Sequence, residues 1–260
     1  MRPWFLVVEQ KPGSAAYNMA VDEFLFQACR PHKDSFLRLY SWDCPSFSFG
    51  ATQRIERAVD LSRVKELQCA YVRRLTGGKT VLHNHEITYA VATASRHFIN
   101  ESDLFTSYRD ISLVLINALD AVGVKAALAG AAASSLVRSD LPCFSFPSSH
   151  EIEVGGKKII GSAQKRDQFA LLQHGSIPLS MDYELYAAGT AFNAADIRNK
   201  MLTLSEAANC SEGEMIAALI KAFADFSGAD LEKYVFSEDD LRIINELERK
   251  YSSQDWNHMR

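Results

Sequence analysis

The order of apolar and polar residues in the first half of the chain predicts alternating strands and helices. Apolar residues recur at helical spacing in residues 15–29, where Ser14 is placed to cap the helix. Residues 61–67 and 104–122 also fit helices, and Gly123 suits the end of the second. Strands are predicted at residues 4–9, 36–40, 46–50, 70–74, 80–82 and 86–93. We expect the last two strands to pair with each other.

The second half of the chain begins with a predicted hairpin and ends with helices. Gly155 and Gly156 lie between two apolar-rich stretches and tolerate the backbone of a tight turn. The strands are expected at residues 151–154, 158–164 and 169–178, and the helices at residues 206–225 and 238–251. This irregular mixture predicts an α+β fold with a mixed β-sheet. The change of pattern near Leu204 predicts a catalytic domain at residues 1–204 and a small helical segment at residues 205–260.

Composition narrows the class of protein. The chain has 260 residues, 47% of them hydrophobic and 23% charged, with a net charge of −4. This balance is typical of a globular protein and lacks the basic excess of a nucleic-acid-binding domain. No apolar run is long enough for a membrane span, and the apolar start at residues 4–8 is too short for a signal peptide. We therefore expect a cytoplasmic protein with no membrane contact.

The cysteines support the same compartment. Their number is odd and they are scattered, without a Cys-x-x-Cys pair: Cys29, Cys44, Cys69, Cys143 and Cys210. This spacing argues against a disulfide framework and against a structural zinc site. In a reducing compartment, any of these thiols could act as a nucleophile.

Three stretches are candidates for chemistry. Arg73 and Arg74 precede a Gly77-Gly78 turn, where hydrogen-bond donors and an accessible backbone suit a ligand with anionic or carbonyl oxygens. On the strand after Gly156, alternation turns Lys158 inward and Lys157 outward, and a buried lysine is costly without a partner or a role. Cys143 lies between two prolines in an irregular segment. The alternatives are a surface hairpin, two solvated lysines and a small buried thiol.

Five blocks in the same order carry a family resemblance over residues 3–205. They are Asn18-Met19-Ala20-Val21-Asp22-Glu23; Trp42, Pro45, Phe47, Ser48, Gly50 and Gln53; Arg73-Arg74-x-Thr76-Gly77-Gly78 with His83; Lys158-x-x-Gly161-Ser162-Ala163-Gln164; and Gln173-His174-Gly175-Ser176-Ile177-Pro178-Leu179. The chain resembles the lipoate-protein ligase and octanoyltransferase family. Cys143 followed by Phe144 resembles the branch that uses a cysteine nucleophile. Lys79 departs from the arginine or small residue often found after the double glycine.

The resemblance implies a biotin-ligase-like mixed sheet flanked by helices, and a two-step transfer without a cofactor. The Cys143 thiol takes an octanoyl or lipoyl group from acyl carrier protein and passes it to a lysine of a lipoyl domain, in glycine-cleavage H protein or a dehydrogenase E2 subunit. Lys158 either favours the thiolate or hydrogen-bonds the acyl carbonyl. The implied substrate-binding residues are Arg73, Arg74, Thr76, Gly77, Gly78, His83, Gly161, Ser162, Ala163, His174 and Gly175. His83 either moves a proton or orders the loop, and His174 has an equally good structural explanation.

Apolar residues on the strands are candidates for lining a tunnel for the acyl chain: Val72, Val81, Tyr89 and Ile160. Three other functions stay open: an ATP- and magnesium-dependent lipoate ligase, an amidotransferase between lipoyl domains, and a lipoyl-domain binder without activity. We expect a monomer that binds no nucleic acid or metal.

Overall fold

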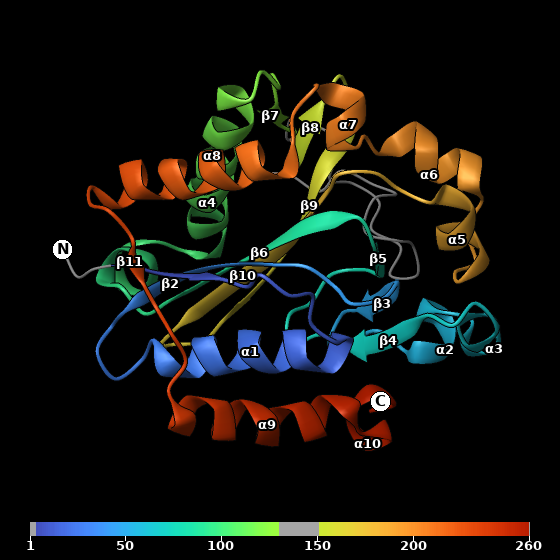
Figure 1. Cartoon of the computed structure of the whole chain (residues 1–260), viewed down its shortest axis with the longest axis horizontal. Helices are drawn as coiled ribbons and strands as arrows, with labels where there is room; N and C mark the ends of the chain where they lie inside the picture. The colour runs from blue at the N-terminus through green and yellow to red at the C-terminus, as the bar shows by residue number, and fades with distance from the viewer. Residues whose placement is uncertain (1–3, 130–150, 260) are drawn as a thin grey trace.

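Two β-sheets organise residues 4–129 and 151–259, the part of the chain that the computed structural model describes. The strands in it are β1 (Trp4–Val8), β2 (Ser35–Tyr40), β3 (Ser46–Phe49), β4 (Ala70–Arg73), β5 (Val81–His83), β6 (Glu86–Thr93), β7 (Ala127–Leu128), β8 (Ile152–Val154), β9 (Lys157–Arg166), β10 (Leu171–Pro178) and β11 (Glu232–Lys233). Eight of these described strands pair in the order β11-β1-β2-β6-β10-β9-β8-β7, and three in the order β4-β3-β5 (Figure 1). Both sheets mix parallel and antiparallel pairs.

Helices cover both faces of the larger sheet, and others pack on the smaller sheet. They are α1 (Ala15–Ala28), α2 (Ile55–Ala58), α3 (Leu61–Glu66), a π-helical turn (His97–Glu101), α4 (Leu104–Ala121), α5 (Tyr183–Ala188), α6 (Ala194–Lys200), α7 (Leu204–Ala207), α8 (Glu212–Ser227), α9 (Glu238–Ser252) and α10 (Gln254–Asn257). In Figure 1, α1 and α9 lie on one side of the sheet and α4 and α8 on the other. The predicted α+β fold with a mixed sheet and flanking helices is confirmed.

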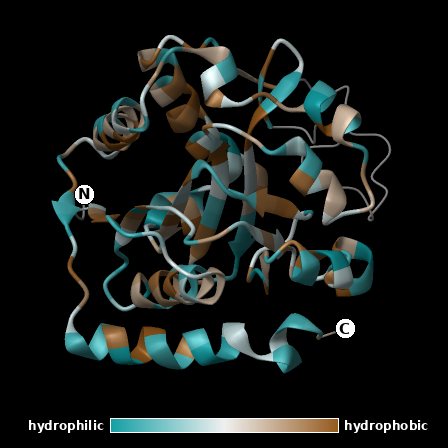
Figure 2. Cartoon of the chain, turned by 45° about the vertical axis from the view of Figure 1, so that its right-hand side comes forward, coloured by the Kyte–Doolittle hydropathy of each residue, from teal (hydrophilic) through white to brown (hydrophobic). Residues whose placement is uncertain are grey.

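Alternation along the central strands feeds two separate cores. On β2, Leu37 and Leu39 pack with α4 and α8, whereas Phe36 and Tyr40 pack with α1 and α9. Every residue of β2 is buried, as expected for a strand with helices on both faces. Figure 2 shows hydrophobic residues gathered on the central strands. A third core joins the smaller sheet to α2, α3, α5 and α6.

Most predicted elements are present, with ends shifted by one or two residues. Ser14 caps α1, and its hydroxyl accepts the backbone N–H of Tyr17 at 3.1 Å. Gly155 and Gly156 form the predicted hairpin turn, both with positive φ. At the end of α4, Val122 is the cap and Gly123 follows it with φ of 85°.

One pairing prediction was wrong. The strands near residues 80–82 and 86–93 exist, but they belong to different sheets: β5 pairs with β3, whereas β6 lies between β2 and β10. Alternation identifies a strand without naming its partner. The predicted helix at residues 206–225 is also split, because Ser211 starts α8 with a capping box to Glu214.

Residues 205–259 pack closely on the rest of the described chain. The predicted helical segment is present, and it also contributes strand β11, which adds to the edge of the larger sheet beside β1. On α9, the Tyr251 hydroxyl and the Lys250 amine both donate to the Glu23 carboxylate at 2.6 Å. The domain boundary near Leu204 stays a prediction. Among the described residues, no helix combines the length and apolar character that crossing a membrane requires.

Candidate active site

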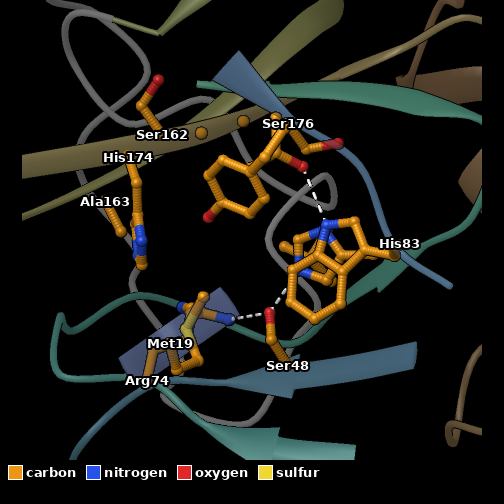
Figure 3. A pocket seen from close by; sticks show the side chains of 14 residues that line it. Met19, Ser48, Arg74, His83, Ser162, Ala163, His174 and Ser176 are labelled. Atoms are coloured by element: carbon orange, nitrogen blue, oxygen red, sulfur yellow. Dashed lines mark hydrogen bonds between the residues drawn. The ribbon is translucent and has the colours of Figure 1, made fainter. Parts of the chain in front are cut away.

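A narrow pocket lies at the seam between the two sheets (Figure 3). It is partly open to solvent. Residues from α1, from strands of both sheets and from the segments that follow β2 and β4 line it: Met19, Tyr40, Trp42, Ser48, Arg74, Val81, His83, Thr88, Gly161, Ser162, Ala163, His174, Gly175 and Ser176. The wall is largely apolar, with a few polar groups held by hydrogen bonds. Such a lining suits an organic group with an apolar body and a polar end.

His83 is held on one wall by contacts with both sheets. Its Nδ1 lies 2.7 Å from a Glu86 oxygen, and its Nε2 lies 2.5 Å from the Ser48 hydroxyl. The Trp42 ring stacks on the imidazole at 4.0 Å between centroids. Because a carboxylate accepts hydrogen bonds, Glu86 directs the Nδ1 proton of His83 toward itself and leaves Nε2 to accept from Ser48. The imidazole thus has a fixed orientation and a fixed tautomer.

The Glu86 carboxylate is itself held in place by hydrogen bonds. It accepts hydrogen bonds from the Ser176 hydroxyl at 2.6 Å and from the Thr88 hydroxyl. The Thr88 oxygen in turn accepts the Trp42 indole N–H at 2.8 Å. A buried carboxylate with these partners is stable in the interior, whereas one without them would be costly.

Arg74 connects the pocket to the double-glycine loop. One guanidinium nitrogen donates to the Ser48 hydroxyl at 2.7 Å, and another donates to the carbonyl oxygens of Gly77 and Lys79 at 3.0 and 2.9 Å. Figure 3 shows Arg74 and Ser48 side by side at the pocket floor. The Ser48 hydroxyl therefore lies between a cation and an imidazole, which orients it as a donor to His83.

His174 occupies the opposite wall and links the loop to the N-terminal helix. Its Nε2 contacts the Thr76 hydroxyl at 2.7 Å, and its Nδ1 contacts the Asp22 carboxylate at 2.7 Å. Asp22 also binds Arg38 at 2.7 Å and accepts from the Tyr40 hydroxyl at 2.9 Å. Burial lowers the pKa of His174 from its usual 6.5, and this outweighs the opposing effect of Asp22. The ring is therefore neutral and donates from Nδ1.

Asp22 remains charged despite its burial. Burial alone would raise its pKa, but the hydrogen bond from His174 and the Arg38 charge together lower it below the usual 3.8. Arg38 is fully buried and also binds Glu9 at 2.5 Å and the Asn18 side-chain oxygen at 3.0 Å. Asn18 and Asp22 of the block at residues 18–23 thus support the pocket wall, whereas Glu23 binds α9.

Lys158 points inward, as alternation predicted. It is 4% exposed and forms an ion pair with Glu151 at 2.7 Å. Its neighbour Lys157 turns outward and donates to the Arg198 carbonyl oxygen at 3.2 Å. Lys158 does not line the described pocket but lies on β9, three residues before Gly161, which does. The ion pair holds the lysine in place beside this part of the strand.

Seven of the predicted substrate-binding residues line the pocket: Arg74, His83, Gly161, Ser162, Ala163, His174 and Gly175. Thr76, Gly77 and Gly78 lie in the loop behind it and act on it through His174 and Arg74. Of the proposed tunnel residues, Val81 lines the pocket, and Val72, Tyr89 and Ile160 are buried elsewhere. The predicted nucleophile, Cys143, lies outside the described residues.

Arg73 differs from Arg74. Its guanidinium does not line the pocket, and all its hydrogen bonds go to backbone carbonyl oxygens. The pattern in the sequence could not separate two adjacent arginines. Sequence reasoning also missed Glu86 and Glu151, the partners of His83 and Lys158. The sequence does carry one sign of Glu86, because this residue follows His83 by three positions. Both residues lie on strands that bury their side chains.

The described cysteines are not activated as nucleophiles. All four are free thiols, and burial raises the pKa of each: Cys29 to about 12, and Cys44, Cys69 and Cys210 above the usual 9.0. Within the described ranges of the chain, no group of three or more histidines, cysteines or carboxylates is placed to hold a metal ion.

Comparisons with known proteins identify the family and the fold of the chain. Residues 14–224 match the lipoyl protein ligase A/B catalytic domain. The chain is 35% identical to the octanoyltransferase LipM of Kyrpidia tusciae, with 99% of each chain covered. Its fold is similar to that of a lipoate-protein ligase A bound with ATP, with a TM-score of 0.84, 24% identity and 99% of each chain covered.

A second solved structure is as similar. It is a bipartite lipoate protein ligase studied with its E2 lipoyl domain, from Thermoplasma acidophilum. The TM-score is 0.84 and the identity 23%, with 100% of this chain and 98% of the other covered. The chain belongs to the lipoyl protein ligase A/B catalytic domain family. The family predicted from the sequence blocks is confirmed.

The neutral state of His174 predicts a pH dependence of stability. Below pH 6.5 the unfolded chain binds a proton at this residue that the folded chain does not, because burial lowers the folded pKa. The free energy of unfolding should fall as pH drops below 6.5, by up to about 1.4 kcal/mol per pH unit. Asp22 contributes its own loss only at lower pH, below 3.8. Urea unfolding between pH 5 and 7.5 measures the effect.

His174→Asn keeps a donor facing Asp22 and removes the titration, so its slope in this pH range should be smaller. His32→Asn, at an exposed histidine, is the matched control and should keep the wild-type slope. Equal slopes for wild type and His174→Asn would contradict the assignment.

Proposed function

We propose that this protein is an octanoyltransferase that moves an octanoyl group from acyl carrier protein to a lysine of a lipoyl domain. The similarity to the octanoyltransferase LipM over 99% of both chains carries this conclusion. The described pocket supports it, because its apolar lining suits an acyl chain and each buried methylene contributes about 0.8 kcal/mol. The reaction is an exchange of a thioester for an amide, which runs downhill without a nucleotide.

Cys143 is the proposed nucleophile. Its thiolate attacks the thioester carbonyl of the donor, a new carbon–sulfur bond forms, and the bond to the carrier sulfur breaks. The carrier leaves as a thiolate and takes up a proton. Support comes from the four described cysteines, whose raised pKa values keep them as thiols at neutral pH.

In the second step the acceptor lysine amine attacks the Cys143 thioester and the amide forms. The cysteine thiolate leaves, and the amine loses a proton. The chain from Ser48 to His83 to Glu86 is the proposed route for that proton, because Ser48 faces the pocket and donates to an imidazole fixed by a carboxylate. Lys158 is proposed to stabilise the negative charge that develops on the carbonyl oxygen in both steps.

The remaining substrate contacts follow from the pocket. Arg74, Ser162, Ala163 and Gly175 line it beside Gly161, and we assign them to the acyl group and its carbonyl. An E2 lipoyl domain or a glycine-cleavage H protein is the proposed acceptor; the archaeal ligase of similar fold was studied with its E2 lipoyl domain. We further propose that the enzyme works in the cytoplasm as a monomer and needs no cofactor.

Incubation with octanoyl-acyl carrier protein, without ATP, should add one octanoyl group to the purified protein. Intact-mass analysis should show the adduct, hydroxylamine should remove it, and Cys143→Ala should abolish it. Cys210→Ala, at a half-buried thiol of raised pKa, is the matched control and should acylate normally. Lipoyl-domain modification that appears only with ATP and free acid would instead support a ligase. A donor that must be an acylated H protein would support an amidotransferase.

Replacing Lys158 should slow both half-reactions. Lys158→Met leaves the buried Glu151 without this ion pair, so the double variant Lys158→Met/Glu151→Gln keeps the site neutral. We expect a loss of about 10²–10³-fold in each half-reaction, measured by rapid-quench acylation and by transfer to a lipoyl domain. Lys157→Met, at the adjacent outward lysine, should retain wild-type rates. A double variant that folds and keeps both rates would exclude the proposed role.

His83→Gln should slow the second half-reaction more than the first, because only the amine must lose a proton. The expected loss is about 10²-fold, in the range of general-base catalysis. Single-turnover transfer from the preformed acyl-enzyme measures this step. Glu86→Gln should give a smaller loss, and His85→Gln, at an exposed histidine two residues away, should give none. Equal losses in both half-reactions for His83→Gln would assign the residue to loop order alone.

A further inference from the structure

Arg73 lies at a junction of three segments that are far apart in the sequence. Its side chain is 1% exposed, at the end of β4 and immediately before Arg74. The guanidinium donates to carbonyl oxygens in the turn after β3 and in the segment that contains α10. We name residues 50–53 the 50–53 turn. Residues 256–259, which comprise the end of α10 and the two residues after it, are named the 256–259 segment.

The bonds to the 256–259 segment are dense. Arg73 donates from Nε to the Trp256 carbonyl at 3.1 Å and from one terminal nitrogen to the carbonyls of Asn257 and Met259 at 2.8 and 2.9 Å. The Arg73 backbone N–H donates to the Asn257 side chain at 2.7 Å, and the Trp256 indole donates back to the Arg73 carbonyl at 2.9 Å. A cation at the carboxyl end of a short helix is favourable, because the last carbonyls there lack helical partners.

The other terminal nitrogen holds the 50–53 turn. It donates to the carbonyl oxygens of Gly50, Ala51 and Gln53 at 3.3, 3.0 and 2.7 Å. The Arg73 guanidinium also lies over the Phe49 ring, 4.9 Å from its centroid. All donors of a buried cation are thus satisfied by backbone oxygens and an aromatic face.

The 50–53 turn lies directly against the double-glycine loop. The Ala51 N–H donates to the Thr76 carbonyl at 2.8 Å. A Cβ atom added to Gly50 would lie 2.2 Å from the Gly78 carbonyl oxygen, so no larger residue fits there. A shift of the turn must therefore shift the loop, whose Gly77 and Lys79 carbonyls hold Arg74 and, through it, Ser48.

We propose that the 256–259 segment positions the pocket loop through Arg73, which makes Arg73 a positioning residue and not a substrate contact. The order of contacts is the 256–259 segment, Arg73, the 50–53 turn, the Gly77–Gly78 loop and then Arg74. The proposal concerns the structure of the pocket wall and holds whatever group the pocket takes. Only its effect on turnover rests on the proposed function.

Hydrogen exchange of the full-length protein tests this order. Asn257→Ala removes the acceptor of the Arg73 backbone N–H, and Arg73→Lys keeps the charge but loses most of the carbonyl contacts. The Ala51 N–H is the reporter, because it bonds to Thr76 and not to the 256–259 segment. Exchange at Ala51 and in residues 74–80 should become about tenfold faster in both variants, the size expected when one or two net hydrogen bonds are lost.

Tyr251→Phe is the matched control. It removes the hydrogen bond from the Tyr251 hydroxyl to Glu23 on α1. The hydrogen bonds of Arg73 stay in place. It should lower the melting temperature without faster exchange at Ala51. The proposal is overturned if Asn257→Ala leaves exchange at Ala51 unchanged, or if Tyr251→Phe accelerates it equally.

Turnover gives the second readout. The kcat/KM for octanoyl transfer should fall about tenfold in Asn257→Ala, in step with exchange, and stay at the wild-type value in Tyr251→Phe. A wild-type protein without transferase activity, in which exchange still responds to Asn257→Ala, would reject the proposed function and leave the positioning role standing. Faster exchange with unchanged kcat/KM would show that the loop is held by the 256–259 segment without consequence for the reaction, and would overturn the predicted effect on turnover.

Discussion

The buried charge of Asp22 is the constraint on which the pocket depends. A carboxylate with so little exposure is tolerated only because Arg38, Tyr40 and His174 bind it from three directions. These contacts tie α1 to β2 and β10, and they fix His174 as a neutral ring that holds Thr76. One ionised group on a helix therefore determines the tautomer of a wall residue and the position of the loop behind it. Loss of any of these three partners would leave the buried Asp22 charge without one of its contacts, and would not simply create a small cavity.

The sequence predicted the elements with regular patterns better than their arrangement. The long helix α4 and the hairpin of β8 and β9 are strong local signals, since periodicity and turn glycines act within a few residues. The short helices α5 and α6 were missed, because six or seven residues give too few repeats for a periodic pattern. The pairing of β5 was wrong for another reason: partners are chosen by packing between layers, which alternation along one strand does not encode.

The same limit applies to the site. Motif blocks located the pocket wall from Arg74 to Gly175, and alternation predicted which of two lysines is buried. Motifs and alternation could not identify the residue that pairs with each buried charged or titratable side chain. Glu151 and Glu86 acquire their roles only when the strands are assembled. Arg73 is the clearest example, because its partners near residue 257 lie 183 to 186 positions away along the chain.

The placement of the pocket at a seam has a consequence for how such a site can vary. Its walls come from two sheets, each with its own strand pairing, and the third core packs on the smaller sheet. The width of the cavity therefore depends on the spacing between the two sheets more than on the size of any single residue that lines it. Small changes in the third core, around α5 and α6, could tilt the smaller sheet and change the width of the cavity. The hydrogen bonds between the strands would stay intact. Residues of α5 and α6 are thus expected to affect the width of the cavity without lining it.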